Sequence, residues 1–211
     1  MRTIETAVYK FNELSDAAKE KAREWYRGHG EYVCYDFIYE DAAEVAKILG
    51  FDICQTRKQL MNGEHRYDPT IYWSGFWSQG DGACFEGSYA WNKGCVEAIK
   101  KYAPKDTALH NIAYSLWQMQ RPWFYKLTGS VKHSGHYYHE RSMECSLDHS
   151  EYTYGYNSPL PEDEFTDICA DFAHWIYKQL EREYEWQMSD ENVDESIVAN
   201  EYEFTENGEI A

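Results

Sequence analysis

Apolar side chains recur every three or four residues in several parts of the chain, a spacing that predicts amphipathic helices with one buried face. Ser15 is a favoured N-cap for the first of these helices, and Gly28 marks its end. Gly50 follows the second helix, where a left-handed cap is expected, and Pro161 opens the last. The expected helices cover residues 15–28, 36–49, 93–102, 107–120 and 161–186.

Segments rich in beta-branched and aromatic residues separate these helices and predict strands. The dipeptides Asn62-Gly63 and Ser134-Gly135 each mark a hairpin turn between two such segments. Because the strongest strand pair is a local hairpin, we expect an α+β fold, an antiparallel β-sheet with amphipathic helices packed mainly on one face. The expected strands lie within residues 3–11, 51–60, 71–77 and 84–91 and in both halves of 123–148.

The length of the chain suits one α+β domain, expected over residues 1–187 and followed by an acidic C-terminal tail over residues 188–211. Eleven acidic residues and one basic residue lie between positions 181 and 211. Such a composition is typical of a solvated segment. Residues 202–205 (YEFT) nevertheless have the composition of an edge strand, so partial docking of the tail is left open.

Charge narrows the choice of partners. The chain carries 37 acidic and 20 basic residues, a formal net charge of −17. A surface of this sign disfavours direct binding to nucleic acid and attachment to an anionic membrane. It attracts cationic partners instead. Because the N-terminus does not resemble a secretory leader and no apolar run reaches roughly 18 residues, we expect a cytoplasmic protein.

The segment Tyr72–Gly87 (YWSGFWSQGDGACFEG) is the candidate site. Its composition predicts a β-turn-β unit in which Gly80, Gly82 or both adopt positive φ. Asp81 between these glycines is either a turn residue that bonds its own backbone or a general base or metal ligand, supported by Glu86.

Histidines offer a second chemical possibility. His133, His136 and His139 lie around the predicted turn, but a straight strand cannot direct all three at one metal ion. The six cysteines form no CxxC pair, which indicates packed thiols rather than zinc ligands. We therefore expect no metal and no cofactor. A metal-dependent hydrolase or phosphodiesterase that uses Asp81, Glu86 and these histidines is kept as an alternative.

Aromatic residues are unusually frequent, with 8 Trp, 19 Tyr and 9 Phe. Ten rings exceed the needs of one small core, so some of them are expected to be exposed or to line a cavity. They are Tyr72, Trp73, Phe76, Trp77, Trp91, Trp117, Trp123, Tyr125, Tyr137 and Tyr138. The rings nearest the candidate site suit a protein-binding patch or a stacking pocket for a nucleotide. The candidate binding residues are Tyr72, Trp73, Phe76, Trp77, Gln79, Asp81, Phe85, Glu86, His136, Tyr137 and His139.

Three segments, YKFNELSDAAKEKAREWY, YWSGFWSQGDGACFEG and FAHWIYKQLEREYEWQMSDE, carry a resemblance. The chain resembles a group of proteins of tailed phages and prophages, some of which are labelled antitoxin-like. The resemblance implies a gene of a phage or mobile element that is expressed inside a bacterium. It also implies a role against host defence, through a basic effector or a signalling nucleotide. It supplies no catalytic residues.

From these observations we expect a non-enzymatic inhibitor or binding protein that acts through an acidic surface and an aromatic patch. The expected partner is a bacterial host protein, such as a basic nucleic-acid-binding effector, and homodimer formation is left open. The alternatives are the hydrolase above and a nucleotide-binding sponge with its pocket around Tyr72–Phe85.

Overall fold

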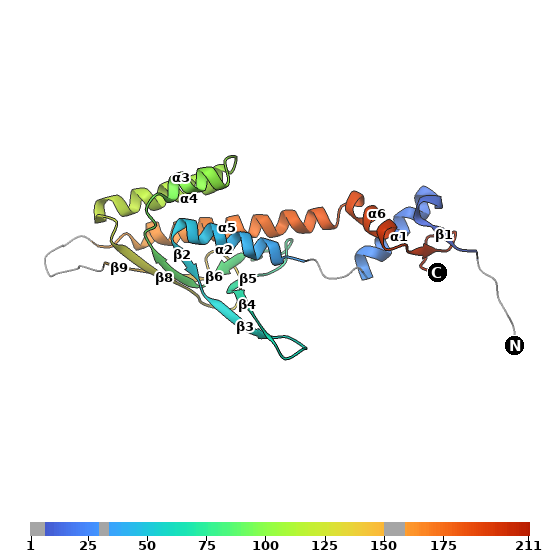
Figure 1. Ribbon diagram of the computed structural model, residues 1–211, viewed down its shortest axis with the longest axis horizontal. Coiled ribbons are helices and arrows are strands. Elements are labelled where there is room, and N and C mark those ends of the chain that lie inside the picture. The colour runs from blue at the N-terminus through green and yellow to red at the C-terminus, as the bar shows by residue number, and fades with distance from the viewer. Residues whose placement is uncertain (1–6, 30–33, 150–158) are drawn as a thin grey trace. The chain divides into compact units, whose positions relative to one another are not determined.

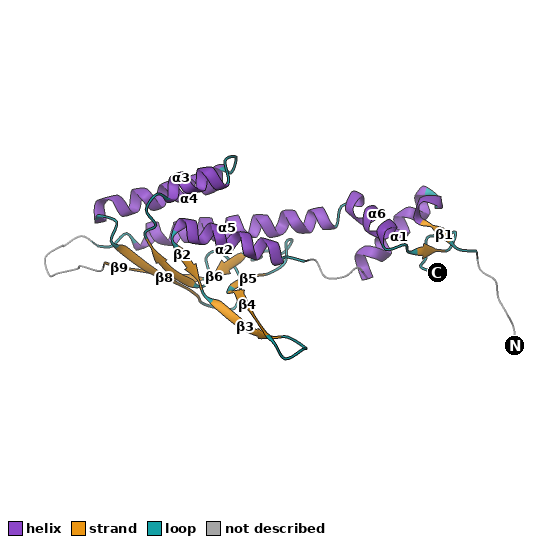
Figure 2. Cartoon of the chain, in the orientation of Figure 1, coloured by secondary structure: helices purple, strands orange, loops and turns teal. Residues whose placement is uncertain are grey.

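The computed structural model describes residues 7–29, 34–149 and 159–211. Internal contacts divide the chain into two compact units, one formed by Met1–Cys34 with Glu181–Ala211 and the other by Tyr35–Leu180. The first unit therefore joins both ends of the chain, whereas the sequence placed a boundary at residue 187. Figure 1 labels the helices and strands, and Figure 2 distinguishes them by colour.

The larger unit is built on a four-stranded antiparallel sheet with the strand order β2-β7-β8-β9. The helices lie on one side of this sheet, as Figure 1 shows, and the expected α+β class is confirmed. The strands are β2 (Phe51–Ile53), β7 (Gly87–Ala90), β8 (Leu127–His133) and β9 (Met143–His149). The helices are α2 (Asp36–Leu49), α3 (Cys95–Tyr102), α4 (Thr107–Gln120), η2 (Arg121–Trp123) and the part of α5 (Glu162–Gln187) that ends at Leu180.

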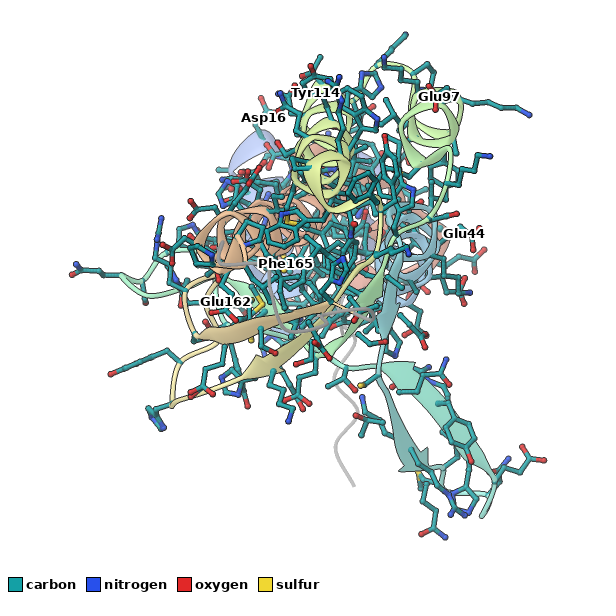
Figure 3. All side chains as sticks on the ribbon, turned by 90° about the vertical axis from the view of Figure 1, so that its left-hand side faces the viewer. Asp16, Glu44, Glu97, Tyr114, Glu162 and Phe165 are labelled. Carbon is teal, nitrogen blue, oxygen red and sulfur yellow. The ribbon has the colours of Figure 1, made fainter. Side chains whose placement is uncertain are left out.

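Two small hairpins complete this unit. The strand pair β3 (Gln55–Gln59) and β4 (His65–Pro69) turns at Gly63, which has φ +85°. All five residues of β3 are exposed, and this hairpin projects away from the helices in Figure 3. The second pair, β5 (Ile71–Trp73) and β6 (Ala83–Phe85), carries the candidate site.

The core of the larger unit lies between the sheet and α5. The ring of Phe51 stacks on two rings of α5. Its centroid lies 5.6 Å from that of Phe172 and 6.2 Å from that of Phe165. Figure 3 shows Phe165 among the side chains above the strands. A Cβ at Gly129 of β8 would lie 2.7 Å from this ring, so α5 packs closely on the sheet only because residue 129 is glycine. The apolar face of α5 is buried, as an amphipathic helix predicts; it consists of Phe165, Ile168, Phe172, Trp175 and Ile176.

Helix ends follow the sequence closely, whereas one hairpin does not. Gly50 caps α2 with φ +99°, as its position predicts. Ser134-Gly135 does not form a two-residue turn, because β8 ends at His133 and β9 begins at Met143. The connection instead closes through bonds from Ser134 N to Ser142 O at 2.8 Å and from Ser142 N to His139 O at 2.9 Å.

The smaller unit packs the C-terminal segment against the N-terminal helix. It contains β1 (Tyr9–Lys10), η1 (Phe11–Glu13), α1 (Asp16–His29), α6 (Asp190–Ala199) and β10 (Glu203–Phe204). Its core consists of Phe11, Leu14, Ala18, Ala22, Val193, Ile197 and Phe204. Residues 188–211 thus include a helix, and a strand that pairs with β1. Of the strand expected over residues 3–11, residues 3–6 lie outside the described part, and the rest gives β1 and η1.

Ion pairs between the two helices neutralise part of the acidic segment. Arg23 donates to both carboxylate oxygens of Asp194, at 2.6 and 2.7 Å, and Arg27 pairs with Asp190. A Cβ at Gly208 would lie 2.1 Å from the backbone oxygen of Ala18, so the segment after β10 approaches α1 closely. Apolar residues hidden among acidic ones therefore fold this segment. In the part of the chain that the structure describes, no helix is both long and apolar enough to cross a membrane.

Candidate functional site

The loop between β5 and β6, residues 74–82, closes around the carboxylate of Asp81. We call it the Trp77 loop. Asp81 Oδ2 accepts hydrogen bonds from the backbone N–H groups of Trp77, at 2.9 Å, and Ser78, at 2.6 Å. The backbone N–H of Asp81 donates in turn to Ser78 O at 3.0 Å. Gly80 has φ +100°, as expected, whereas Gly82 is outside the positive region. The carboxylate of Asp81 therefore fixes the shape of the loop.

The Trp77 loop presents one large ring to solvent. Phe76 lies 5.0 Å from the ring of Trp73 and 5.5 Å from that of Tyr177, so it anchors the loop to β5 and α5. The hydroxyl of Tyr177 also donates to Gly75 O at 3.0 Å. The neighbouring Trp77 is 78% exposed. The loop is thus braced from below while its indole remains accessible, which is the arrangement of a preorganised interface anchor.

Trp73 links this loop to α2. Its Nε1 donates to the hydroxyl oxygen of Tyr39 at 2.8 Å, and its ring meets Tyr35 edge-on at 5.0 Å. Burial raises the pKa of Tyr39, so this hydroxyl remains neutral and available to accept the bond. Trp73 is therefore a structural support for the loop.

Tyr72 points to the opposite face of β5, as alternation along a strand requires. Its ring stacks on Tyr138 at 5.1 Å and lies 5.5 Å from His133, so it joins β5 to the β8–β9 connection. Burial, followed by the nearby charge of Glu86, raises the pKa of Tyr72. Ser74 Oγ donates to the backbone oxygen of Tyr138 at 3.4 Å. The two halves of the predicted site thus meet through packed rings.

Other side chains of the β8–β9 connection contact residues close to them in the sequence. His139 Nδ1 accepts from the backbone N–H of Arg141 at 3.1 Å, and its Nε2 lies 3.5 Å from a carboxylate oxygen of Glu140. Tyr137 is exposed and meets the ring of its neighbour His136 edge-on at 5.2 Å. Gln79 is exposed on the Trp77 loop.

Phe85 and Glu86 lie apart from the exposed ring. Phe85 is fully buried and meets Phe51 and Phe172 edge-on, so it belongs to the core. Burial raises the pKa of the adjacent Cys84 thiol to about 11, which keeps it protonated and unreactive. Glu86 is half-buried at the junction of β6 and β7. The sequence analysis placed Phe85 and Glu86 in one site with Trp77 because they are close in the chain, but Phe85 is buried in the core and Glu86 is half-buried just after β6.

The carboxylates and histidines named as candidates for acid–base or metal chemistry do not gather into one site in the described residues. Asp81 Oδ2 is committed to two backbone donors, and Glu86 follows the far end of β6. His149 donates its backbone N–H to Asp148 Oδ1 at 2.7 Å, a local contact. Among residues 7–29, 34–149 and 159–211, no three His, Cys, Asp or Glu side chains gather closely enough to hold a metal ion.

A second aromatic site lies between α3 and α4. A pocket of about 820 Å³ opens there, and we call it the α3–α4 pocket. Three of its rings, Trp91, Trp117 and Tyr125, were marked by the sequence only as surplus to the core. The lysines and Tyr114 gave no local signal in the sequence, because Lys93 precedes α3, Lys100 lies on α3 and Tyr114 lies on α4. The side chains that define the pocket are Trp91, Lys93, Lys100, Tyr114, Trp117 and Tyr125.

Comparison with known proteins places the chain in a family. No curated protein and no solved structure matches this chain. A family model described as a domain of unknown function (DUF8835) matches residues 34–190. That span contains both the Trp77 loop and the α3–α4 pocket and covers well over half of the sequence. The chain therefore belongs to the DUF8835 family.

Proposed function

We propose that this protein is a phage-encoded, non-enzymatic binding protein that inhibits a basic protein of the bacterial host. Trp77 is its central contact, and the acidic charge of the chain steers the partner toward it. Binding takes place in the host cytoplasm and counteracts a defence system. The phage context comes from the resemblance of the sequence, and the mode of binding comes from the geometry of the Trp77 loop.

The exposed, braced indole of Trp77 is the observation that carries this proposal. Tryptophan is enriched among the residues that dominate binding energy at interfaces, and Trp77 is 78% exposed. The bonds that Asp81 and Tyr177 form with the backbone of the Trp77 loop fix its shape, and the ring of Phe76 meets the indole edge-on at 6.2 Å. Less conformational freedom is then lost on association.

The charge of the chain supports a basic partner. A formal net charge of −17 produces a field that accelerates encounter with a cationic surface. Such a field is screened over roughly 8–10 Å at ordinary ionic strength, so its contribution must fall as salt is added. The proposal therefore predicts an association rate that depends on salt and a dissociation rate that depends on Trp77.

The hydrolase alternative has weaker support. A general base must have a free lone pair directed at the proton it removes. Asp81 Oδ2 accepts two backbone hydrogen bonds within the Trp77 loop, which gives this carboxylate a structural role, and in the described residues no three metal-ligating side chains gather around it. Binding through Trp77 requires no such group, which is why we favour it.

The test is quantitative capture from host cells that carry defence systems. Tagged wild-type protein, Trp77→Ala and Tyr67→Ala are expressed at equal levels, and the proteins retained by each are measured by mass spectrometry. Tyr67 is a matched control because it is another exposed aromatic of the same unit, 59% exposed on the β3–β4 hairpin.

We expect one basic protein at near-stoichiometric amount with the wild type and with Tyr67→Ala, and a large reduction with Trp77→Ala. Capture carried out at higher salt should recover less of it with the wild type and with Tyr67→Ala, because the association rate falls. Equal recovery by all three proteins, or retention of no protein by any of them, would contradict the proposal.

A further inference from the structure

The α3–α4 pocket has the dimensions and walls of a small-molecule site. Its volume of about 820 Å³ lies within the range of typical ligand pockets, roughly 300–1,000 Å³. Two ring pairs line it. Trp91 and Tyr125 lie 5.1 Å apart with a tilt of 31°, and Tyr114 and Trp117 lie 5.4 Å apart and are stacked. Tyr114 is 50% exposed and Tyr125 is 40% exposed, so both retain free ring surface for a planar ligand.

Positive charge gathers at this pocket although the chain as a whole is strongly acidic. Lys93 and Lys100 line it, and among the described residues neither forms an ion pair. The guanidinium of Arg121 lies over the ring of Trp117 at 5.4 Å, at an adjoining hollow that shares Tyr114 and Trp117. Glu97 is the one carboxylate among the residues lining the pocket, and Figure 3 shows it on α3, with Tyr114 on the neighbouring α4.

The start of α3 also lies at the pocket, where its first turn carries the carboxylate of Glu97 beside the partial positive charge of the helix start. Gly94 is its N-cap and offers no side chain to bond the first amides of the helix, and both Gly94 and Cys95 line the pocket. The start of a helix carries partial positive charge, which favours an anion nearby. Rings, lysines and the helix start thus meet at one opening, and together they select a ligand that is planar at one end and anionic at the other.

We propose that the α3–α4 pocket binds a free nucleotide, whose base stacks on the exposed rings and whose phosphates pair with Lys93 and Lys100. Base stacking on aromatic side chains tolerates any base, and ammonium groups bind phosphate without a fixed geometry. This site is separate from the Trp77 loop, so a ligand there does not depend on the partner proposed above. The sequence-based expectation of a nucleotide pocket around Tyr72–Phe85 concerns a different part of the fold and stays a separate prediction.

The test is isothermal titration calorimetry of the full chain at low salt with ATP, GTP, CTP and UTP. Adenosine, pyrophosphate and choline serve as probes of the separate parts of the ligand. The variant Lys93→Glu/Lys100→Glu reverses both charges of the pocket. Its control, Lys101→Glu/Lys105→Glu, makes the same change in net charge at two exposed lysines that do not line the pocket.

We expect at least one nucleoside triphosphate to bind with a dissociation constant below about 1 mM, and adenosine and pyrophosphate to bind at least tenfold more weakly. Lys93→Glu/Lys100→Glu should weaken binding at least tenfold and the control less than threefold. Tyr114→Ala, at a half-exposed ring, should weaken it at least fivefold, and it provides a second variant if the charge reversal disturbs folding.

Three results would overturn the proposal. The first is the absence of binding by every nucleotide at millimolar concentration. The second is equal binding of pyrophosphate and ATP, which would indicate a bare anion site. The third is tighter binding of choline than of any nucleotide, because aromatic rings also attract organic cations.

Discussion

Asp81→Ala should loosen the Trp77 loop and weaken binding without removing a catalytic group. The substitution deletes the acceptor of two backbone hydrogen bonds, from Trp77 at 2.9 Å and from Ser78 at 2.6 Å. Each contributes a net 0.5–1.5 kcal/mol in a typical protein, with exposed bonds toward the lower end. We therefore expect the free energy of unfolding to fall by about 1–2 kcal/mol.

Asp81→Asn is the matched comparison. The amide oxygen of asparagine can accept from both backbone N–H groups, so the loop retains its shape and loses only the charge. We expect a loss of less than about 1 kcal/mol in the free energy of unfolding and near-normal binding to the captured partner. A general base cannot be replaced by an amide, so an enzyme would lose turnover in both variants.

Two assays check this prediction. Urea denaturation gives the free energy of unfolding, and hydrogen exchange measured by mass spectrometry reports on the amides of residues 74–82. Exchange in this segment should accelerate in Asp81→Ala and stay close to wild type in Asp81→Asn. The reasoning is refuted if the two variants are equally destabilised, or if neither changes exchange in the loop.

Three further substitutions test the packing on which the account rests. Gly208→Ala should destabilise the smaller unit by clearly more than the roughly 1 kcal/mol expected for Gly135→Ala, as thermal unfolding will show. Both glycines have positive φ, but only a Cβ at Gly208 meets the α1 backbone, at 2.1 Å. Ile197→Ala removes a fully buried side chain and should cost about 2–5 kcal/mol in urea denaturation; a loss below 1 kcal/mol would indicate that α6 is not docked. Asp68→Asn tests pH dependence, because the hydrogen bond and charge of Arg66 hold the pKa of Asp68 below its usual value of 3.8. Because the folded-state pKa is depressed, the wild type should exceed Asp68→Asn in stability at neutral pH, and the difference should shrink as pH falls through 3.8 and below; a difference that does not change with pH would contradict the ion pair.

Local signals explain why the helices were predictable. Helix α2 ends where Gly50 supplies a left-handed cap, and α5 begins beside Pro161 with its apolar stripe intact. Such features act within a few residues and can be read from the sequence alone. The β8–β9 connection differs from its prediction because Ser134-Gly135 competes with tertiary contacts, among them the stacking of Tyr138 on Tyr72.

The acidic composition of the C-terminal segment did not predict that it folds. Its acidic residues suggested a solvated tail, yet Val193 and Ile197 are one helical turn apart and pack on α1. Two apolar residues at helical spacing are weak evidence for a buried helix in a sequence. They are sufficient to dock α6 when α1 offers a complementary apolar face and Arg23 pairs with Asp194. The apolar face of α1 belongs to a distant part of the sequence, so it cannot be inferred from the C-terminal segment alone.

The structure separates the residues that the sequence grouped into one candidate site. The prediction that the segment Tyr72–Gly87 presents aromatic rings fits the exposure of Trp77, whereas Phe85 belongs to the core. The α3–α4 pocket could not be located because Lys100 of α3 and Tyr114 of α4 come together only when the two helices pack. Aromatic excess predicted that some rings are exposed or line a cavity, and only the fold shows which rings do so.

The central claim is that Trp77 dominates binding to a basic host protein. The most direct measurement is the dissociation constant of that protein, once captured, for the wild type, Trp77→Ala and Tyr67→Ala at physiological salt. A buried anchor contributes about 2 kcal/mol or more, which corresponds to a loss of about 30-fold for Trp77→Ala and little change for Tyr67→Ala. Equal affinities for all three folded proteins would contradict the account.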